Sequence, residues 1–273
     1  MAEGFLSPKS DVIFKLLFGD TRSIDLLTDF LKSVLRLPND EYDEVTIVDP
    51  HLLREFEADK LGILDVKVKT KTKKIIDIEI QILPSPQLKQ RVIFYSSKMV
   101  TEQVGIGENY QKIKRVISII ITDYLLIPGS QKYHHRFVLY DPEAGIEFTD
   151  IIEVNTLEIP KLPEIEDGTQ LWNWLKFLSA ERKEDLDMIA EKSPQVKKAV
   201  VRLMELSNDE RTRLLYESRQ KMEWDNQARE QGAVKTREYE IARNALQKKM
   251  PIDDIVDITG LTHEEIEGLQ VTN

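Results

Sequence analysis

LGILDVKVKTKTKKIIDIEIQI, residues 61–82, is the most informative stretch of this 273-residue chain. Apolar and polar residues alternate in two runs on either side of a lysine-rich reversal, a pattern typical of a β-hairpin. Successive side chains of a strand point to opposite faces. In the second run, three isoleucines therefore share one face, while Asp77, Glu79 and Gln81 share the other.

The position of the turn predicts which residues of the hairpin face each other. A turn centred near Thr72 pairs Asp65 with Glu79 and Lys67 with Asp77. Opposed residues lie about 4.5–5.5 Å apart at Cβ, so two opposed carboxylates repel unless a cation lies between them. Hard divalent cations such as Mg²⁺ bind oxygen ligands. The hairpin thus favours a metal site, although a plainer alternative, in which both acids pair with hairpin lysines, stays open.

The flanking sequence predicts a mixed α/β domain. Ser10 precedes a helical pattern that ends at Gly19, and the run at residues 115–123 is rich in β-branched residues, as in a strand buried on both faces. The remaining predicted elements are helices at 23–35, 85–104, 171–179, 183–192 and 195–206 and strands at 45–53, 134–140, 145–148 and 151–159. The order helix, three strands, helix, strand favours a parallel crossover from the hairpin onto the strand at 115–123.

Five ordered segments make the chain resemble a known family. They are SPKSDVIFKLLFG (7–19), IEIQ (78–81), RVIFYSSKM (91–99), YQKIKRVISIIITD (110–123) and LWNWLKFL (171–178). Together they resemble the Rpn-type recombination-promoting nuclease/putative transposase family of the PD-(D/E)XK nuclease superfamily. The resemblance implies a restriction-endonuclease-like αβββαβ core with a helical C-terminal region.

The resemblance also implies roles for the hairpin residues. Asp65 and Glu79, joined by the main-chain carbonyl of Ile80, would hold Mg²⁺ or Mn²⁺. Gln81 stands where the superfamily pattern usually has a lysine, and this form is common in the family itself. Glutamine can hydrogen-bond water or phosphate but brings no charge, so another cation would have to replace the lysine. Lys67 and Lys98 are both candidates for it.

The first predicted helix carries two further candidates for the catalytic site. Asp11 and Lys15 lie four residues apart and therefore on one helix face. They form a plain ion pair in one interpretation. In the other, which the resemblance implies, Asp11 lies beside the metal and Lys15 near a phosphate.

Basic residues near the predicted site point to a nucleic-acid partner. The hairpin lysines Lys67, Lys69, Lys71 and Lys73 lie close together without intervening acids. Arg91, Tyr95 and Lys98 share one face of the helix that follows. These residues would contact DNA phosphates; alternatively, lysines of an edge hairpin block aggregation and the helix face is simply solvated.

Composition restricts the classes of function. The net charge of −10 argues against coating of nucleic acid by the whole surface. The chain contains no cysteine, which excludes disulfides and thiolate metal sites. Its N-terminal residues show no basic and apolar signal regions, and its longest aliphatic run is far shorter than a membrane span. We therefore expect a cytoplasmic protein with no membrane partner.

The predicted domains are a nuclease-like domain at 1–160, a helical region at 161–250 and a short helical tail at 251–273. The charged helical stretch 209–249 is typical of a solvated or self-associating helix, which makes a homo-oligomer an option, and Gly232 is a candidate kink. Residues 251–269 contain acids and no Lys or Arg, so we expect the tail to contact protein rather than DNA.

These observations lead to one main functional hypothesis and one alternative. The main hypothesis is a metal-dependent DNA endonuclease of low sequence specificity, associated with recombination or transposition. The alternative is a catalytically inactive nuclease fold that acts through protein or nucleic-acid binding.

Overall fold

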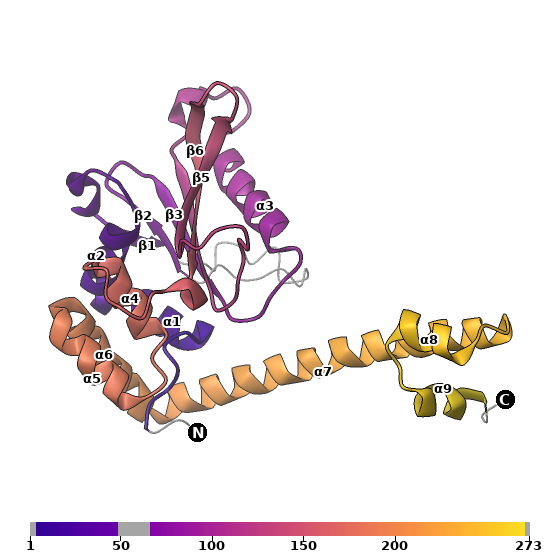
Figure 1. Cartoon of the computed structure of the whole chain (residues 1–273). Helices are drawn as coiled ribbons and strands as arrows, with labels where there is room; N and C mark the ends of the chain where they lie inside the picture. The colour runs from indigo at the N-terminus through magenta and orange to yellow at the C-terminus, as the bar shows by residue number, and fades with distance from the viewer. Residues whose placement is uncertain (1–3, 49–65, 271–273) are drawn as a thin grey trace. The chain divides into compact units, whose positions relative to one another are not determined.

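The structure is a computed structural model that describes residues 4–48 and 66–270 (Figure 1). The chain divides into two compact units, Met1–Tyr216 and Glu217–Asn273. The division falls inside the long helix α7, Glu210–Gln247.

A six-stranded sheet in the order β1-β2-β3-β4-β6-β5 forms the centre of the first unit. Strands β3, β4 and β6 are mutually parallel, and the remaining pairs are antiparallel. The strands are β1 Thr46–Val48, β2 Val66–Lys69, β3 Ile75–Gln81, β4 Val116–Thr122, β5 His134–Asp141 and β6 Ile146–Glu158. The predicted hairpin and the parallel crossover onto the strand after it are confirmed.

The register of the hairpin agrees with the sequence prediction where the structure describes it. Lys67 lies opposite Asp77, and Val66 lies opposite Ile78. The backbone of Lys73 has a positive φ of 70°, and its N–H donates to the carbonyl of Thr70, which closes the turn. Asp65 lies outside the described residues, so its pairing with Glu79 stays a prediction.

Helices cover both faces of the sheet (Figure 1). Helix α3 lies on one face, and α1, α2 and α4 lie on the other. The helices of this unit are α1 Asp11–Phe18, α2 Ile24–Val34, α3 Leu88–Thr101, α4 Gln170–Leu178, α5 Lys183–Lys192 and α6 Pro194–Asn208. Short 3-10 turns occur at Thr21–Ser23, Asn39–Tyr42, Tyr110–Lys112 and Ile159–Lys161.

The main core joins the sheet to the helices after residue 160. Trp174 of α4 is fully buried and makes edge contacts with Phe18 of α1 and Phe30 of α2. The same cluster contains Ile76 and Ile78 of β3. The predicted division after residue 160 therefore differs from the observed one after Tyr216, because α4, α5 and α6 complete the core on which the sheet packs.

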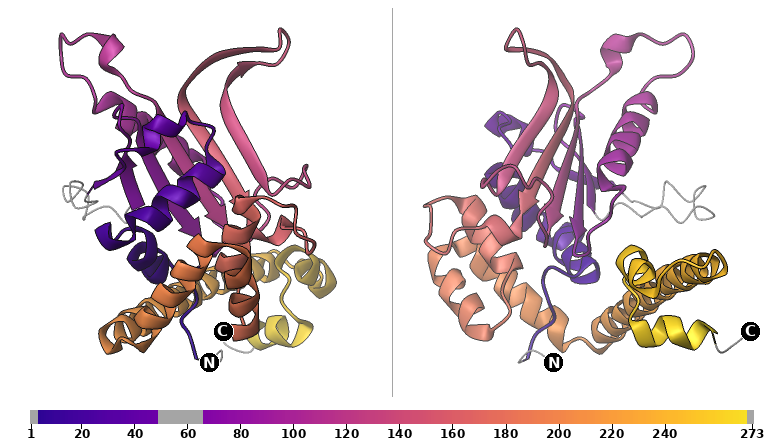
Figure 2. Two further views of the ribbon diagram at one scale, coloured as in Figure 1. Left: turned by 90° about the vertical axis from the view of Figure 1, so that its left-hand side faces the viewer. Right: turned by 45° about the vertical axis from the view of Figure 1, so that its right-hand side comes forward.

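The β5–β6 hairpin extends past the other strands (Figure 2). The sequence predicts two strands at 145–148 and 151–159, but the structure has the single strand β6 with irregular pairing to β5. His134 and His135 lie on opposite faces of β5, as adjacent residues of a strand do. They contact different partners: His134 Nε2 lies 3.0 Å from Asn155 Oδ1, and His135 Nε2 lies 2.7 Å from Ser130 Oγ.

The second unit contains the later part of α7 with α8, Ile252–Thr259, and α9, His263–Gln270. A small core formed by Ala242, Ala245, Ile255, Leu261 and Ile266 holds these helices together. A capping box begins α9, because the Thr262 and Glu265 side chains each accept the other's backbone N–H. Helix α7 runs unbroken through Gly232.

Within the described residues, no helix combines the length and the apolar character that crossing a bilayer requires.

Candidate active site

The polar face of β3 lies beneath α3. Ile75 packs against Met99 of α3, and Ser118 on the neighbouring strand bonds to Ser96 of α3 at 2.9 Å. Asp77 and Glu79, which share this face with Ile75, are 3% and 8% exposed. The alternation of the sequence correctly predicted that Asp77 and Glu79 share one face of β3. Both acids are buried because α3 packs on that face.

Two side chains, one from β3 and one from α3, bind the Glu79 carboxylate. Gln81 Nε2 donates to Glu79 Oε1 at 2.6 Å, from the same face of β3. The Arg91 guanidinium of α3 donates to the same oxygen and forms an ion pair with it. Because both contacts use Oε1, Glu79 keeps Oε2 for a further ligand. The carboxylate is thus oriented before any metal or substrate binds.

Burial raises the pKa of Glu79 above its ordinary value, while Arg91 and Gln81 oppose that rise. The cause is that a carboxylate loses hydration when it is buried, which disfavours the charged form. A divalent cation at Oε2 would restore much of the lost stabilisation. Perturbed carboxyl groups of this kind are concentrated at functional sites.

The two lysines considered as the missing cation face other acids. Lys67 lies opposite Asp77, and burial lowers its pKa while nearby Glu102 and Asp77 oppose the change. Lys98 Nζ lies 3.7 Å from a carboxylate oxygen of Glu102. Among the described residues, the cation that contacts Glu79 is Arg91. Tyr95, on the same face of α3, makes an edge contact with Phe94, which is 59% exposed.

Lys9 is a further cation at the carboxyl ends of the central strands. Its Nζ lies 2.7 Å from a carboxylate oxygen of Asp123, the residue after β4. The backbone N–H of Asp123 donates to the carbonyl oxygen of Gln81 at 3.1 Å. Lys9 was not among the sequence candidates, because only the parallel pairing of β3 and β4 brings Asp123 beside Gln81. The sequence feature that could have indicated Lys9 is its position in the segment SPKSD, which is part of the family resemblance.

The first helix packs against β3 from the face opposite to the one that Glu79 and α3 share. Its Asp11 and Lys15 side chains are half-buried, and Asp11 Oδ1 accepts the backbone N–H of Val12 at 2.7 Å. Their roles in catalysis stay predictions.

The hairpin lysines separate into two groups. Lys71 pairs with Asp43 at 3.2 Å, and Lys74 pairs with the buried carboxylate of Glu41. Lys69 and Lys73 instead line a cavity of about 320 Å³. The other residues that line this cavity are Ile75, Gln103, Lys112 and Lys114.

Lys69, Lys73, Lys112 and Lys114 thus lie around the first residue of β3, Ile75, which precedes Glu79 by four residues. Lys112 and Lys114 were not among the sequence candidates, because they lie about forty residues from the hairpin lysines. Gln103 holds the second segment in place: its amide donates to the carbonyl of Lys114 and accepts that residue's N–H.

The described residues contain no group of three or more His, Cys, Asp or Glu side chains arranged for a metal ion. Of the predicted ligands, Glu79 is placed and Asp65 lies outside the described residues. The side chain of Ile80 packs in the main core, consistent with a role that uses its carbonyl oxygen alone. The one placed donor, the oxygen of the Glu79 carboxylate that makes no hydrogen bond to Gln81 or Arg91, suits a hard cation.

A family model described as "PD-(D/E)XK nuclease family transposase" matches residues 8–233. The chain belongs to this family. Comparisons with curated proteins and with solved structures find no match. The matched range contains the αβββαβ core, the helices α4 to α6 and part of α7. The fold expected from the sequence resemblance is therefore confirmed, and this PD-(D/E)XK family member has a nuclease- and transposase-associated function.

Proposed function

We propose that this protein is a metal-dependent endonuclease that hydrolyses phosphodiester bonds of DNA with little sequence specificity. The observation that carries the proposal is the state of Glu79. A buried carboxylate with a raised pKa, held by Arg91 and Gln81, stands at the position of the family's acidic motif. Its alternative, an inactive fold that acts only by binding, has no need for such an arrangement.

Asp65, Glu79 and the main-chain carbonyl of Ile80 would hold Mg²⁺ or Mn²⁺. Such an ion, when bound, lowers the pKa of a water molecule and neutralises charge on the phosphate. The donor set contains oxygen atoms alone, which suits both ions.

The side chains around Glu79 would orient it and the substrate. Arg91 and Gln81 fix Oε1, so that Oε2 is directed without rearrangement. Lys9, at the carboxyl end of β4, is our candidate for the cation that the motif lacks at Gln81. Asp11 and Lys15 on α1 would act beside the metal and near a phosphate. Preorganised charge of this kind stabilises a transition state because no reorganisation is needed during the reaction.

The lysine cavity, defined by Lys69, Lys73, Lys112 and Lys114, would bind the DNA backbone away from the cut. It begins at Ile75, four residues and therefore about 13 Å along the strand from Glu79. One DNA strand advances 3.4 Å per nucleotide, so these lysines would contact phosphates about four nucleotides from the cut. Phosphate contacts position a duplex without reading bases, which accounts for low specificity. Lys67, Lys71, Arg91, Tyr95 and Lys98 remain proposed contributors to DNA binding.

The decisive test is nicking of supercoiled plasmid by the full-length protein. We expect conversion to open circles in Mg²⁺ or Mn²⁺ and none in a chelator, because the bound metal would activate the attacking water. Gel densitometry against time measures the rate. Absence of metal-dependent cleavage of duplex DNA, single-stranded DNA and RNA would refute the proposal in favour of a binding protein.

Lys114→Ala is expected to weaken DNA binding about equally for all sequences and to reduce the salt dependence of binding by about one unit of slope. The reason is that each lysine bound to a phosphate releases about one counterion. Fluorescence anisotropy of a labelled duplex across a salt series measures both quantities. Lys183→Ala, at an exposed lysine of α5 outside the cavity, serves as the control. Equal slopes for the two variants would remove the cavity from the DNA path.

We further propose a cytoplasmic protein that takes part in recombination or transposition, and self-association through its C-terminal helices. Helix α7 exposes apolar side chains in support of the latter, among them Leu214, Leu215, Met222 and Trp224. Light scattering on the full chain, with Leu215→Glu as comparison, measures its mass in solution.

A further inference from the structure

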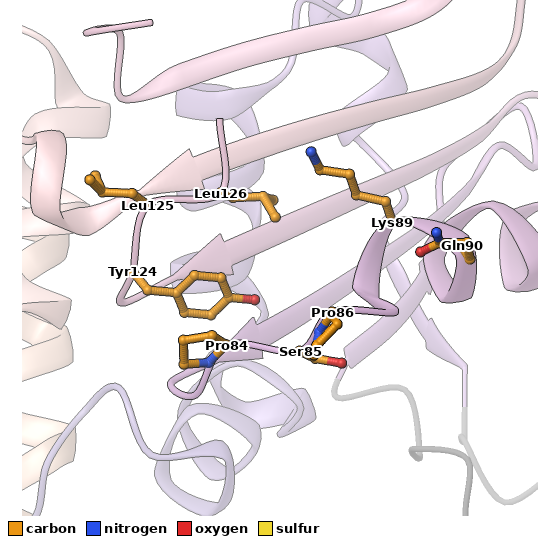
Figure 3. Close-up of a pocket in the computed structure, with 8 residues that line it drawn as sticks. All are labelled: Pro84, Ser85, Pro86, Lys89, Gln90, Tyr124, Leu125 and Leu126. Atoms are coloured by element: carbon orange, nitrogen blue, oxygen red, sulfur yellow. The ribbon is translucent and has the colours of Figure 1, made fainter. Parts of the chain in front are cut away.

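A second cavity, of about 450 Å³, lies at the carboxyl ends of β3 and β4 (Figure 3). Its walls come from the turn after β3, the first turn of α3 and the segment after β4. The lining residues are Pro84, Ser85, Pro86, Lys89, Gln90, Tyr124, Leu125 and Leu126. The cavity is within the size range of small-molecule sites, which are mostly apolar with a few polar groups.

The cavity adjoins the carboxylate of the candidate active site. Arg91, which holds Glu79, directly follows the lining residues Lys89 and Gln90 on α3. Tyr124 follows β4 by two residues, and the charges of Arg91 and Glu79 are close enough to act on the pKa of its hydroxyl, which burial raises. A group in the cavity would therefore lie beside a phosphate bound near Glu79.

The walls of the cavity are preformed. Tyr124 and Leu126 pack against the buried cluster of Leu88, Val92 and Ile120. A hydrogen bond holds the segment after β4 in place: the fully buried carboxylate of Glu158 accepts the backbone N–H of Leu126 at 2.8 Å. A ligand would thus bind without having to order the segment first.

The chemistry of the lining matches a nucleobase. Figure 3 shows the Tyr124 ring between Leu126 and the turn that contains Pro84 and Pro86, with its hydroxyl directed toward Ser85 and Pro86. Flat apolar surfaces of this kind stack on the faces of bases. The Tyr124 hydroxyl oxygen is buried close to the backbone of Ser85 and makes no hydrogen bond of ordinary geometry among the described residues. The exposed Gln90 amide offers hydrogen bonds to a base edge, and Lys89 offers a charge for a phosphate.

We propose that this cavity binds one unpaired nucleobase of the DNA strand, next to the phosphate that is cut. The inference rests on the proposed nuclease function and extends it to the structure of the substrate. A base inside a duplex is stacked and cannot enter the cavity, whereas an unpaired base can leave the helix at small cost. The protein would therefore prefer DNA with bulges, mismatches or single-stranded segments at the cut.

The test uses 2-aminopurine, a base whose fluorescence depends on stacking, placed in a bulge, in single-stranded DNA or in a paired duplex. Full-length protein is titrated in a chelator, so that no strand is cut. We expect a saturable change in emission for the unpaired positions and none for the paired one. Tyr124→Ala should weaken this response by about tenfold, or about 1.4 kcal/mol, because the base loses the aromatic ring on which it stacks.

Three further variants test whether the response depends on the residues that line the cavity. Tyr124→Phe keeps the ring and should retain most of the response, and Tyr140→Ala removes an exposed tyrosine of β5 outside the cavity and should not change it. Gln90→Ala, at an exposed residue, should weaken the response without threatening the fold. Equal binding by wild type, Tyr124→Ala and Gln90→Ala, or an equal response to paired and unpaired bases, would overturn the proposal.

Two further results separate the possible sources of the base. Saturable binding of free 2-aminopurine deoxyribonucleotide, with no response to the same base in DNA, would identify a mononucleotide site and overturn the inference. Docking of the unpaired base by a protein that nicks no plasmid in Mg²⁺ would keep the base site and remove the nuclease function. Nicking without any effect of Tyr124→Ala on the fluorescence would do the reverse.

Discussion

Glu79→Gln lowers metal-dependent nicking by more than about a hundredfold, if Glu79 is a metal ligand. Residues that only orient a ligand typically contribute 10–100-fold to metal affinity or activity, so loss of the ligand itself should cost more. The amide has the shape of the carboxylate and places no charge in a buried position, so the fold should persist. Plasmid nicking rates measure the loss, and thermal unfolding monitors the fold.

Asp77→Asn is the matched control, because Asp77 is a buried acid on the same face of β3 and outside the proposed metal set. Equal losses for the two variants would assign the effect to the strand rather than to the metal site. Asp65→Ala should lower the nicking rate by as much as Glu79→Gln does. The double variant should be no slower than either single variant, because both residues are proposed to bind the same metal ion. Gln81→Lys should preserve or raise activity, because it restores a cation at the usual position of the motif.

Trp174→Ala is expected to lower the free energy of unfolding by about 3–5 kcal/mol, the usual range for removal of a buried tryptophan. Trp174 is fully buried, makes edge contacts with Phe18, Phe30 and Phe177, and donates its indole N–H to Asp29 at 2.8 Å. Its removal leaves a cavity between α4 and the helices on the sheet and leaves Asp29 with fewer partners. Urea unfolding followed by circular dichroism measures the change.

Trp224→Ala is the control, because Trp224 of α7 is 65% exposed and its removal should change the unfolding free energy by less than about 0.5 kcal/mol. The comparison also tests the domain boundary predicted after residue 160. A Trp174→Ala protein whose sheet unfolds with unchanged midpoint would support a nuclease domain that is complete at residue 160. A single destabilised transition would place α4 in the same cooperative unit as the sheet.

The sequence was sufficient for the features that depend on local periodicity. The alternation of residues 61–82 predicted the hairpin, its register at Lys67 and Asp77, and the common face of Asp77, Glu79 and Gln81. The helical periodicity after residue 170 placed α4, α5 and α6 within a few residues of their observed bounds. Such patterns are readable because a strand repeats every two residues and a helix every 3.6.

The partners of each face depended on the tertiary structure, because they lie far apart in the chain. The alternation of β3 indicates a polar face but does not indicate what packs on it. Helix α3 packs on this face, and this packing buries Glu79 and brings Arg91 into contact with it. The pairing of β3 with β4 likewise brings Lys9 and Asp123 to Gln81. Periodicity specifies the direction of a side chain, while the packing of distant elements specifies its neighbours, its hydration and therefore its chemistry.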